Sequence, residues 1–163
     1  MNTFLIWTHR FAQVWAFEDD VGYTGSVADL VKRLRSNRSD LVAWVQQSPV
    51  SPSWVWFNCA TRRFCRRFAQ KRRKKMREHA VRLSHALLET LLAASRRGEI
   101  AWSESSIPTL CLASSTLRFT HLRPFVAQGY YNWDTRVEPA EWEELVVSQS
   151  PSKKRKLFHA LKF

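Results

Sequence analysis

The residues best suited to chemistry form one cationic segment, TRRFCRRFAQKRRKKMR, at positions 61–77. Between Arg62 and Arg77 it carries ten basic side chains and no acid. Guanidinium groups bind phosphate oxygens and guanine edges through paired hydrogen bonds, and lysines bind phosphate as point charges. A phosphate backbone would also relieve the mutual repulsion of these cations and release counterions. The segment therefore predicts a nucleic-acid contact through Arg62, Arg63, Arg66, Arg67, Lys71, Arg72, Arg73, Lys74, Lys75 and Arg77.

The pattern leaves several kinds of ligand open. Structured RNA is favoured over DNA, because no helix-turn-helix spacing surrounds the segment and an arginine-rich helix suits the deformed grooves and loops of RNA. Such a protein could be a small subunit of a ribonucleoprotein or a factor of a virus or mobile element. The alternative of another class is an adaptor or inhibitor whose basic helix occupies an acidic or nucleic-acid-binding groove of a partner enzyme. A DNA-binding regulator is the third interpretation.

A second basic cluster lies in the tail, residues 150–163. Lys153, Lys154, Arg155 and Lys156 follow Ser-Pro and resemble a nuclear localisation signal, although they would be further phosphate contacts in a bacterial or phage protein. We expect an intracellular protein, nuclear in the first case and cytoplasmic in the second. Tyr130 and Tyr131 are candidates for stacking on unpaired bases. Trp54 and Trp56 are expected in the core or at a partner contact.

Metal and catalytic sites are weakly indicated. Cys59, Cys65, His79 and His85 approach the spacing of a two-Cys, two-His zinc finger. The gap between the cysteines is too long, however, and the histidines would stand about 120° apart on a straight helix. The preferred interpretation is that these are structural residues, with no cofactor. The chain has no glycine-rich phosphate loop, HExxH motif or nucleophile elbow, so we expect no enzyme. The remaining catalytic alternative is a metal-independent ribonuclease that uses histidine for acid–base chemistry.

The composition is that of a protein with a core. The 163 residues are 45% hydrophobic and include eight tryptophans, which suits one domain and excludes a disordered basic tail. No apolar run is long enough to span a membrane, and the N-terminus lacks the charged start of a signal peptide. Three cysteines without framework spacing indicate a reducing compartment. The net charge of +12 comes from residues 62–77 and the tail, since the rest has 11 basic and 14 acidic side chains.

The elements that position these residues are expected to be mostly helical. Phe4, Trp7, Phe11, Val14 and Trp15 have helical spacing, although a strand at 3–7 competes with that interpretation. Ser26 caps a short helix that extends to Leu34, and a long helix runs from 59 to 97 before Gly98. Strands at 109–113 and 116–122 form a hairpin, 126–133 adds a strand interrupted at Gly129, and Pro139 begins a short helix.

The predicted fold class is thus α+β and helix-rich. It has one long central helix with an Arg/Lys-rich N-terminal half, short flanking helices and a small C-terminal β-hairpin or sheet. The expected organisation is a helical or mixed segment at 1–47, a Pro/Ser hinge at 48–53, a body at 54–149 with the basic helix, hairpin and short helix, and the basic tail.

Overall fold

Two β-sheets organise the described part of the chain, which in this computed structural model comprises residues 11–46, 48–131, 137–148, 155–159 and 161. The sheets belong to two separate units. The first unit contains described residues 11–16 and 39–121, and the second contains those within 17–38 and 122–163.

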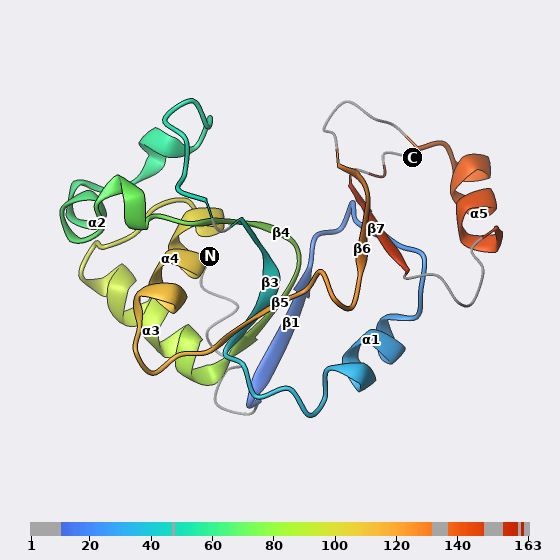
Figure 1. Ribbon diagram of the computed structural model, residues 1–163, viewed down its shortest axis with the longest axis horizontal. Helices are drawn as coiled ribbons and strands as arrows, with labels where there is room; N and C mark the ends of the chain where they lie inside the picture. The colour runs from blue at the N-terminus through green and yellow to red at the C-terminus, as the bar shows by residue number, and fades with distance from the viewer. Residues whose placement is uncertain (1–10, 47, 132–136, 149–154, 160, 162–163) are drawn as a thin grey trace. The chain divides into compact units, whose positions relative to one another are not determined.

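The first unit is built on a four-stranded mixed sheet. Its strands are β1 (Gln13–Phe17), β3 (Leu41–Gln46), β4 (Lys75–Ser84) and β5 (Phe119–His121), in the order β1-β4-β3-β5 (Figure 1). Strand β3 runs antiparallel to β4 and parallel to β5. Because β3 and β4 lie inside the sheet and are covered, their side chains are almost continuously buried.

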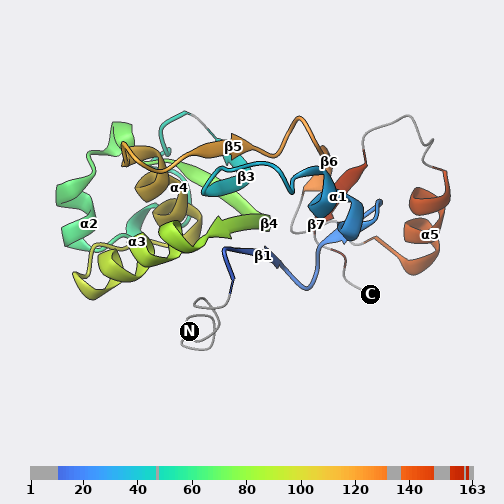
Figure 2. The same cartoon turned by 90° about the horizontal axis from the view of Figure 1, so that it is seen from below.

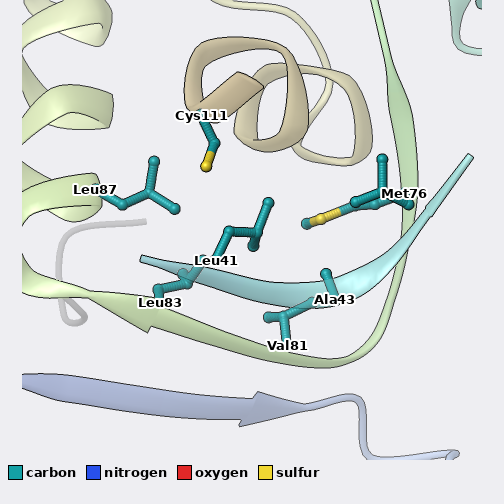
Figure 3. Close-up of a cluster of buried hydrophobic side chains, with 8 residues drawn as sticks. Leu41, Ala43, Met76, Val81, Leu83, Leu87 and Cys111 are labelled. Atoms are coloured by element: carbon teal, nitrogen blue, oxygen red, sulfur yellow. The ribbon is translucent and has the colours of Figure 1, made fainter. Parts of the chain in front are cut away.

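Three helices complete this unit: α2 (Arg62–Arg67), α3 (His85–Arg96) and α4 (Ser103–Ala113). Two 3₁₀ turns, η2 (Phe57–Cys59) and η3 (Gln70–Arg72), flank α2. Figure 3 shows side chains of β3 and β4 pointing toward α3 and α4, where Leu41 and Leu83 face Leu87 and Cys111. Burial of these apolar groups fixes both helices on one face of the sheet.

The prediction of one long central helix over 59–97 is wrong. That stretch contains two short helical segments, a ten-residue strand and then α3. Phe68 and Ala69 adopt extended backbone angles, which end helix α2 at Arg67. From Lys75 onward the chain pairs with β3, and Ser84 then caps α3 by accepting a hydrogen bond from the Leu87 amide. Residues 75–84 form a strand because pairing with β1 and β3 buries their apolar side chains. An isolated cationic helix would not bury them.

The predicted hairpin is also wrong. Residues 109–113 belong to α4, and the following strand β5 pairs in parallel with β3. The α4 residues Ser105, Ser106, Pro108, Thr109, Leu110 and Cys111 are all buried. A helix buried on most sides lacks the amphipathic period that distinguishes a helix from a strand in the sequence.

The second unit is built on a three-stranded sheet, in the order β2-β7-β6. Strand β7 (Lys156–His159) pairs antiparallel with β2 (Gly22–Tyr23) and in parallel with β6 (Ala127–Tyr131), its neighbour in Figure 2. The predicted strand near 126–133 is confirmed, and its pairing shifts register between Gln128 and Tyr131, around the expected interruption. The tail therefore contains a strand with buried Leu157 and Phe158.

Two short helices in this unit agree with their predicted start signals. Helix α1 (Val27–Arg33) begins after Ser26, whose side chain accepts a hydrogen bond from the Asp29 amide at 3.2 Å. Helix α5 (Pro139–Val147) begins at Pro139. The N-terminal helix prediction falls mostly on residues 1–10, outside the described residues. Where it can be compared it is wrong, since Val14 and Trp15 lie in β1.

Candidate nucleic-acid interface

Two phenylalanines determine how the first half of the cationic segment is displayed. Phe64 and Phe68 are buried, with ring centroids 5.0 Å apart, and they pack with Ala94 and Leu110 from α3 and α4. Burying such a side chain contributes about 1.5–3 kcal/mol, which supports a six-residue helix that would not be stable alone. Thr61 caps the helix by accepting a hydrogen bond from the Phe64 amide at 3.2 Å. With the aromatic rings inside, the arginines of α2 face outward.

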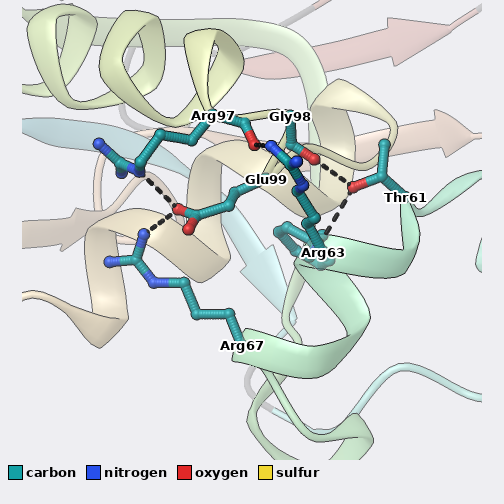
Figure 4. A network of polar contacts seen from close by, with 7 residues as sticks. Thr61, Arg63, Arg67, Arg97, Gly98 and Glu99 are labelled. Carbon is teal, nitrogen blue, oxygen red and sulfur yellow. Dashed lines mark hydrogen bonds and ion pairs between the residues drawn. The ribbon is translucent and has the colours of Figure 1, made fainter.

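Two of these arginines are tied to the segment that follows α3. Arg63 Nη1 donates a hydrogen bond to the Arg97 carbonyl at 2.8 Å, and Arg67 forms an ion pair with Glu99 (Figure 4). Arg97 Nε donates to the same carboxylate at 3.0 Å. Hydrogen bonding from Arg97, and then from Arg67, lowers the pKa of the Glu99 carboxyl. Glu99 therefore remains ionised and neutralises part of the charge at this point.

The backbone at the end of α3 makes this arrangement possible. Gly98 has φ = +66°, the left-handed conformation that glycine adopts without strain, and it follows the helix as the sequence predicted. Its carbonyl accepts a hydrogen bond from Thr61 Oγ1 at 2.6 Å, and the Thr61 amide donates to the Ile100 carbonyl at 2.8 Å. The N-terminus of α2 is thus held against residues 98–100.

Four other exposed cations of the segment are Arg62 and Arg66 on α2, and Lys71 and Arg72 on η3. Within the described residues, none of the four has a hydrogen bond, ion pair or ring contact from its side chain. They form what we term the cationic surface. Arg62 and Arg66 lie one helical turn apart, where like charges repel, so this surface favours an anionic ligand.

The remaining predicted cations, Arg73, Lys74, Lys75 and Arg77, are buried or half-buried in the first unit. Arg73 is buried, donates from Nε to the Phe68 carbonyl at 2.9 Å, and stands 5.4 Å from the centroid of the Phe57 ring. Lys75 lies 5.5 Å from the Trp54 ring centroid. Lys74 and Arg77 are half-buried beside α4 and within β4. Residues that the sequence assigned to one long helix therefore divide between surface and interior.

An aromatic pair near this surface was missed by sequence reasoning. Trp56 and Trp102 stack with ring centroids 4.6 Å apart and planes 11° apart, and Trp102 is 44% exposed. Trp102 follows the segment that pairs with Thr61, which places the pair near the start of α2. No sequence signal links the two tryptophans, because they lie far apart in the chain. An exposed indole face of this kind can stack on an unpaired base.

The second basic segment is only partly described. Lys153 and Lys154 lie outside the described residues, and so do the side chains of Tyr130 and Tyr131, although β6 contains both tyrosines. Lys156 is exposed at the start of β7, and Arg155 precedes it. Arg155 lines a hollow of about 670 Å³ together with Lys32, Arg33 and Tyr23. Burial raises the pKa of the Tyr23 phenol, and the nearby arginines act in the opposite direction.

The predicted zinc ligands do not form a common site where they can be compared. Cys65 lies on α2, His79 is buried in β4, and His85 begins α3, where its Nε2 is 3.7 Å from Glu89 Oε1. Among the residues that the structure describes, these three do not gather within metal-ligand distance of one another. The Cys59 side chain lies outside the described residues.

Comparison with known proteins assigns no class: no family model, curated protein or solved structure matches this chain. In the part of the chain that the structure describes, every helix is too short or too polar to cross a bilayer.

Proposed function

We propose that this protein binds nucleic acid through the cationic surface of α2 and η3, with RNA favoured over DNA. The observation that carries the proposal is the exposure of Arg62, Arg66, Lys71 and Arg72 on an element anchored by buried aromatic rings. The planar guanidinium fork is pre-organised for phosphate oxygens, so an arginine loses less entropy per hydrogen bond than a lysine does. Glu99 is already paired with Arg67 and Arg97, so its charge is not available to neutralise the cationic surface.

The geometry favours single strands and loops over duplex grooves. A helix of six residues is only about 9 Å long, too short to follow a major groove as a recognition helix does. Trp102, which is 44% exposed, is an aromatic side chain of the kind on which an unpaired base can stack. An RNA hairpin loop or a single strand supplies both phosphates and unpaired bases.

The test is a set of fluorescence-anisotropy titrations with the full chain. The probes are an RNA hairpin, a single-stranded RNA and a DNA duplex, and poly-glutamate stands in for an acidic protein partner. At about 100 mM salt we expect tightest binding to the probes with unpaired bases, and a marked loss of affinity as salt is raised. Binding to poly-glutamate as tight as to RNA would favour the adaptor interpretation. Absence of binding to all three nucleic acids would refute the proposal.

A Trp102→Ala variant tests the aromatic contribution. Loss of one stacked base costs about 1–3 kcal/mol, so affinity for single-stranded RNA should fall at least fivefold, while affinity for the DNA duplex stays unchanged. Val55, which is 72% exposed, supplies the control, because Val55→Ala removes apolar surface nearby without a ring. An equal loss for RNA and duplex would exclude stacking on Trp102.

The basic tail extends the proposal to location and assembly. We propose that Lys153–Lys156 directs the protein to the nucleus in a eukaryotic cell, and that the protein works beside others in a larger assembly. A fluorescent fusion carrying alanine at these four positions should leave the nucleus while the unchanged fusion accumulates there. Equal distribution of both fusions would refute the nuclear assignment.

A further inference from the structure

The hollow in the second unit has a cationic lining. Its volume is about 670 Å³, and it is lined by the loop after β2, by helix α1 and by the residue that precedes β7. Among the described residues, its charged lining side chains are Lys32, Arg33, Arg155 and Asp29. Three cations and one carboxylate give the lining a net charge of +2. The hollow therefore suits an anionic ligand.

Backbone pairing holds Arg155 at the edge of this hollow. The Thr24 amide donates to the Lys156 carbonyl at 3.0 Å, and the Lys156 amide donates to the Thr24 hydroxyl at 2.9 Å. From the opposite neighbouring strand, the Ala127 amide donates to the Arg155 carbonyl at 2.9 Å. The backbone from which the Arg155 side chain extends is thus held on both sides, which lowers the entropy cost of binding a ligand there.

Gly25 allows the stem of Arg155 and the ring of Tyr23 to lie against the loop. A Cβ atom at residue 25 would stand 2.7 Å from Arg155 Cγ and 2.9 Å from Tyr23 Cε1. Any larger residue would displace the arginine stem or the phenol ring, so this close approach requires glycine. Burial raises the pKa of the Tyr23 phenol, and Arg33 and Arg155 act in the opposite direction because both guanidinium groups lie near it. The phenol therefore keeps its proton at neutral pH and can donate a hydrogen bond beside two arginines.

Arg33 is oriented by Phe125 and not by its acidic neighbour on the helix. Its guanidinium carbon lies 5.9 Å from the centroid of the Phe125 ring, and Nη1 donates to the Phe125 carbonyl at 3.5 Å. Asp29 and Arg33 have the spacing of a helical ion pair, yet they form none in the described part of the chain. A guanidinium has several N–H donors, so Arg33 retains donors for a ligand.

We propose that this hollow binds a phosphate monoester carried by an organic group of about the size of a nucleoside. Such a phosphate has a charge of about −1.5 to −2 at pH 7, which the net charge of +2 compensates. The forked guanidinium groups of Arg33 and Arg155 match the geometry of phosphate oxygens. The volume lies within the range of about 300–1,000 Å³ that is usual for small-molecule sites, and it exceeds the size of phosphate alone. Leu30, Val146 and the Tyr23 ring supply apolar contacts for the organic group.

The experiment is calorimetric titration of the full chain with adenosine 5′-monophosphate (AMP), adenosine and inorganic phosphate. We expect AMP to bind at least about tenfold more tightly than either of the other two, since only AMP has both the dianion and the organic group. Adenosine or inorganic phosphate binding as tightly as AMP would overturn the proposal, and so would the absence of AMP binding.

A competition assay identifies the source of the phosphate monoester. An RNA strand with a 5′-hydroxyl end contains only phosphodiesters and should not displace AMP. Displacement by the same strand with a 5′-phosphate would assign the site to the end of a strand, and retention of AMP would assign it to a free nucleotide. Equal displacement by both strands would overturn the proposal, because the site would then not recognise a monoester.

Point variants test the lining. Arg33→Ala and Arg155→Ala should each weaken AMP binding at least about tenfold, because each removes charge-assisted hydrogen bonds. Asp29→Asn should strengthen it at least about twofold, because it removes a like charge. The matched control is Arg35→Ala, which removes an exposed cation just beyond α1 that is outside the described lining. This control should bind AMP as the wild type does. Gly25→Ala should weaken binding through displacement of Arg155 and the phenol ring.

Circular dichroism checks the fold of each variant. Arg33 and Asp29 are exposed, so their variants decide the outcome if Arg155→Ala or Gly25→Ala unfolds. An equal loss in Arg33→Ala and Arg35→Ala would overturn the proposal, because binding would then follow net charge. Weaker AMP binding in Asp29→Asn would also overturn it. A variant without the cationic surface should bind AMP as the wild type does, so this proposal and the proposed function can fail separately.

Discussion

The cationic surface makes a quantitative prediction about salt dependence. The perturbation is the simultaneous change of Arg62, Arg66, Lys71 and Arg72 to alanine, which removes the exposed cations of residues 61–77 whose side chains have no partner within the described residues. These side chains bury no apolar core, so we expect the fold to persist. Affinity for nucleic acid should fall, and it should also become less sensitive to salt.

The magnitude follows from counterion release. Each neutralised phosphate of a single strand contributes about 0.7 to the slope of log affinity against log salt, so four contacts contribute roughly 3. Over a fourfold rise in salt the wild type should therefore lose about fiftyfold more affinity than the variant. The assay is fluorescence anisotropy with one single-stranded RNA, at several salt concentrations, on both proteins.

A matched control separates this surface from net charge. Lys32, Arg35, Arg38 and Arg123 are four exposed cations of the second unit, and their change to alanine removes the same charge. This control should keep the wild-type slope. The reasoning is refuted if the two quadruple variants flatten the slope equally, because binding would then follow total charge. It is also refuted if neither changes it.

Three further predictions concern residues inside the first unit. Arg73→Ala should destabilise the protein by about 2 kcal/mol in urea unfolding and leave the salt slope unchanged, because this guanidinium bonds to the Phe68 carbonyl. Asp40→Ala should lower the free energy of unfolding by about 3 kcal/mol, because the Asp40 carboxylate accepts hydrogen bonds from the Ser84 hydroxyl and the Arg118 amide. Asp19 is exposed, so the control Asp19→Ala should change that free energy by no more than about 0.5 kcal/mol. Burial raises the pKa of the Cys111 thiol to about 12. The contribution of this thiol to the free energy of unfolding is therefore complete below about pH 9 and falls by up to about 1.4 kcal/mol per pH unit as pH rises from 9 to 12. Cys111→Ala should lose this pH dependence in unfolding curves measured across that range.

Elements with local start and stop signals could be predicted from the sequence. The cap of α1 at Ser26, the proline that begins α5 and the glycine that follows α3 all act through neighbouring backbone groups. Strand β4 could not be predicted in this way. Its register is determined by pairing with β3, where Leu41 faces Leu83 across 42 positions of sequence, and nothing local encodes that partner.

The same distinction applies to the site. The exposure of Arg62 and Arg66 on α2 depends only on their spacing of one helical turn, which is a local property of the sequence. The burial of Arg73 depends on the chain turning back at η3, and the ion pair of Arg67 depends on Glu99 in a different segment. Long-range contacts thus determine which cations are available to a ligand. The sequence shows only that cations are concentrated in this segment.

The two phenylalanines explain why this division takes the form it does. Phe64 and Phe68 are four residues apart, so a single helical turn buries both, and the arginine pair before each phenylalanine faces outward. In each pair one arginine is bonded to the Arg97–Glu99 segment and the other makes no side-chain contact within the described residues: Arg63 and Arg67 are bonded, whereas Arg62 and Arg66 are not. The repeated RRF pattern therefore supplies an anchor, a brace and an exposed cation in every turn. A uniformly exposed cationic helix would lack the anchor and the brace, and its backbone would lose more conformational entropy on binding.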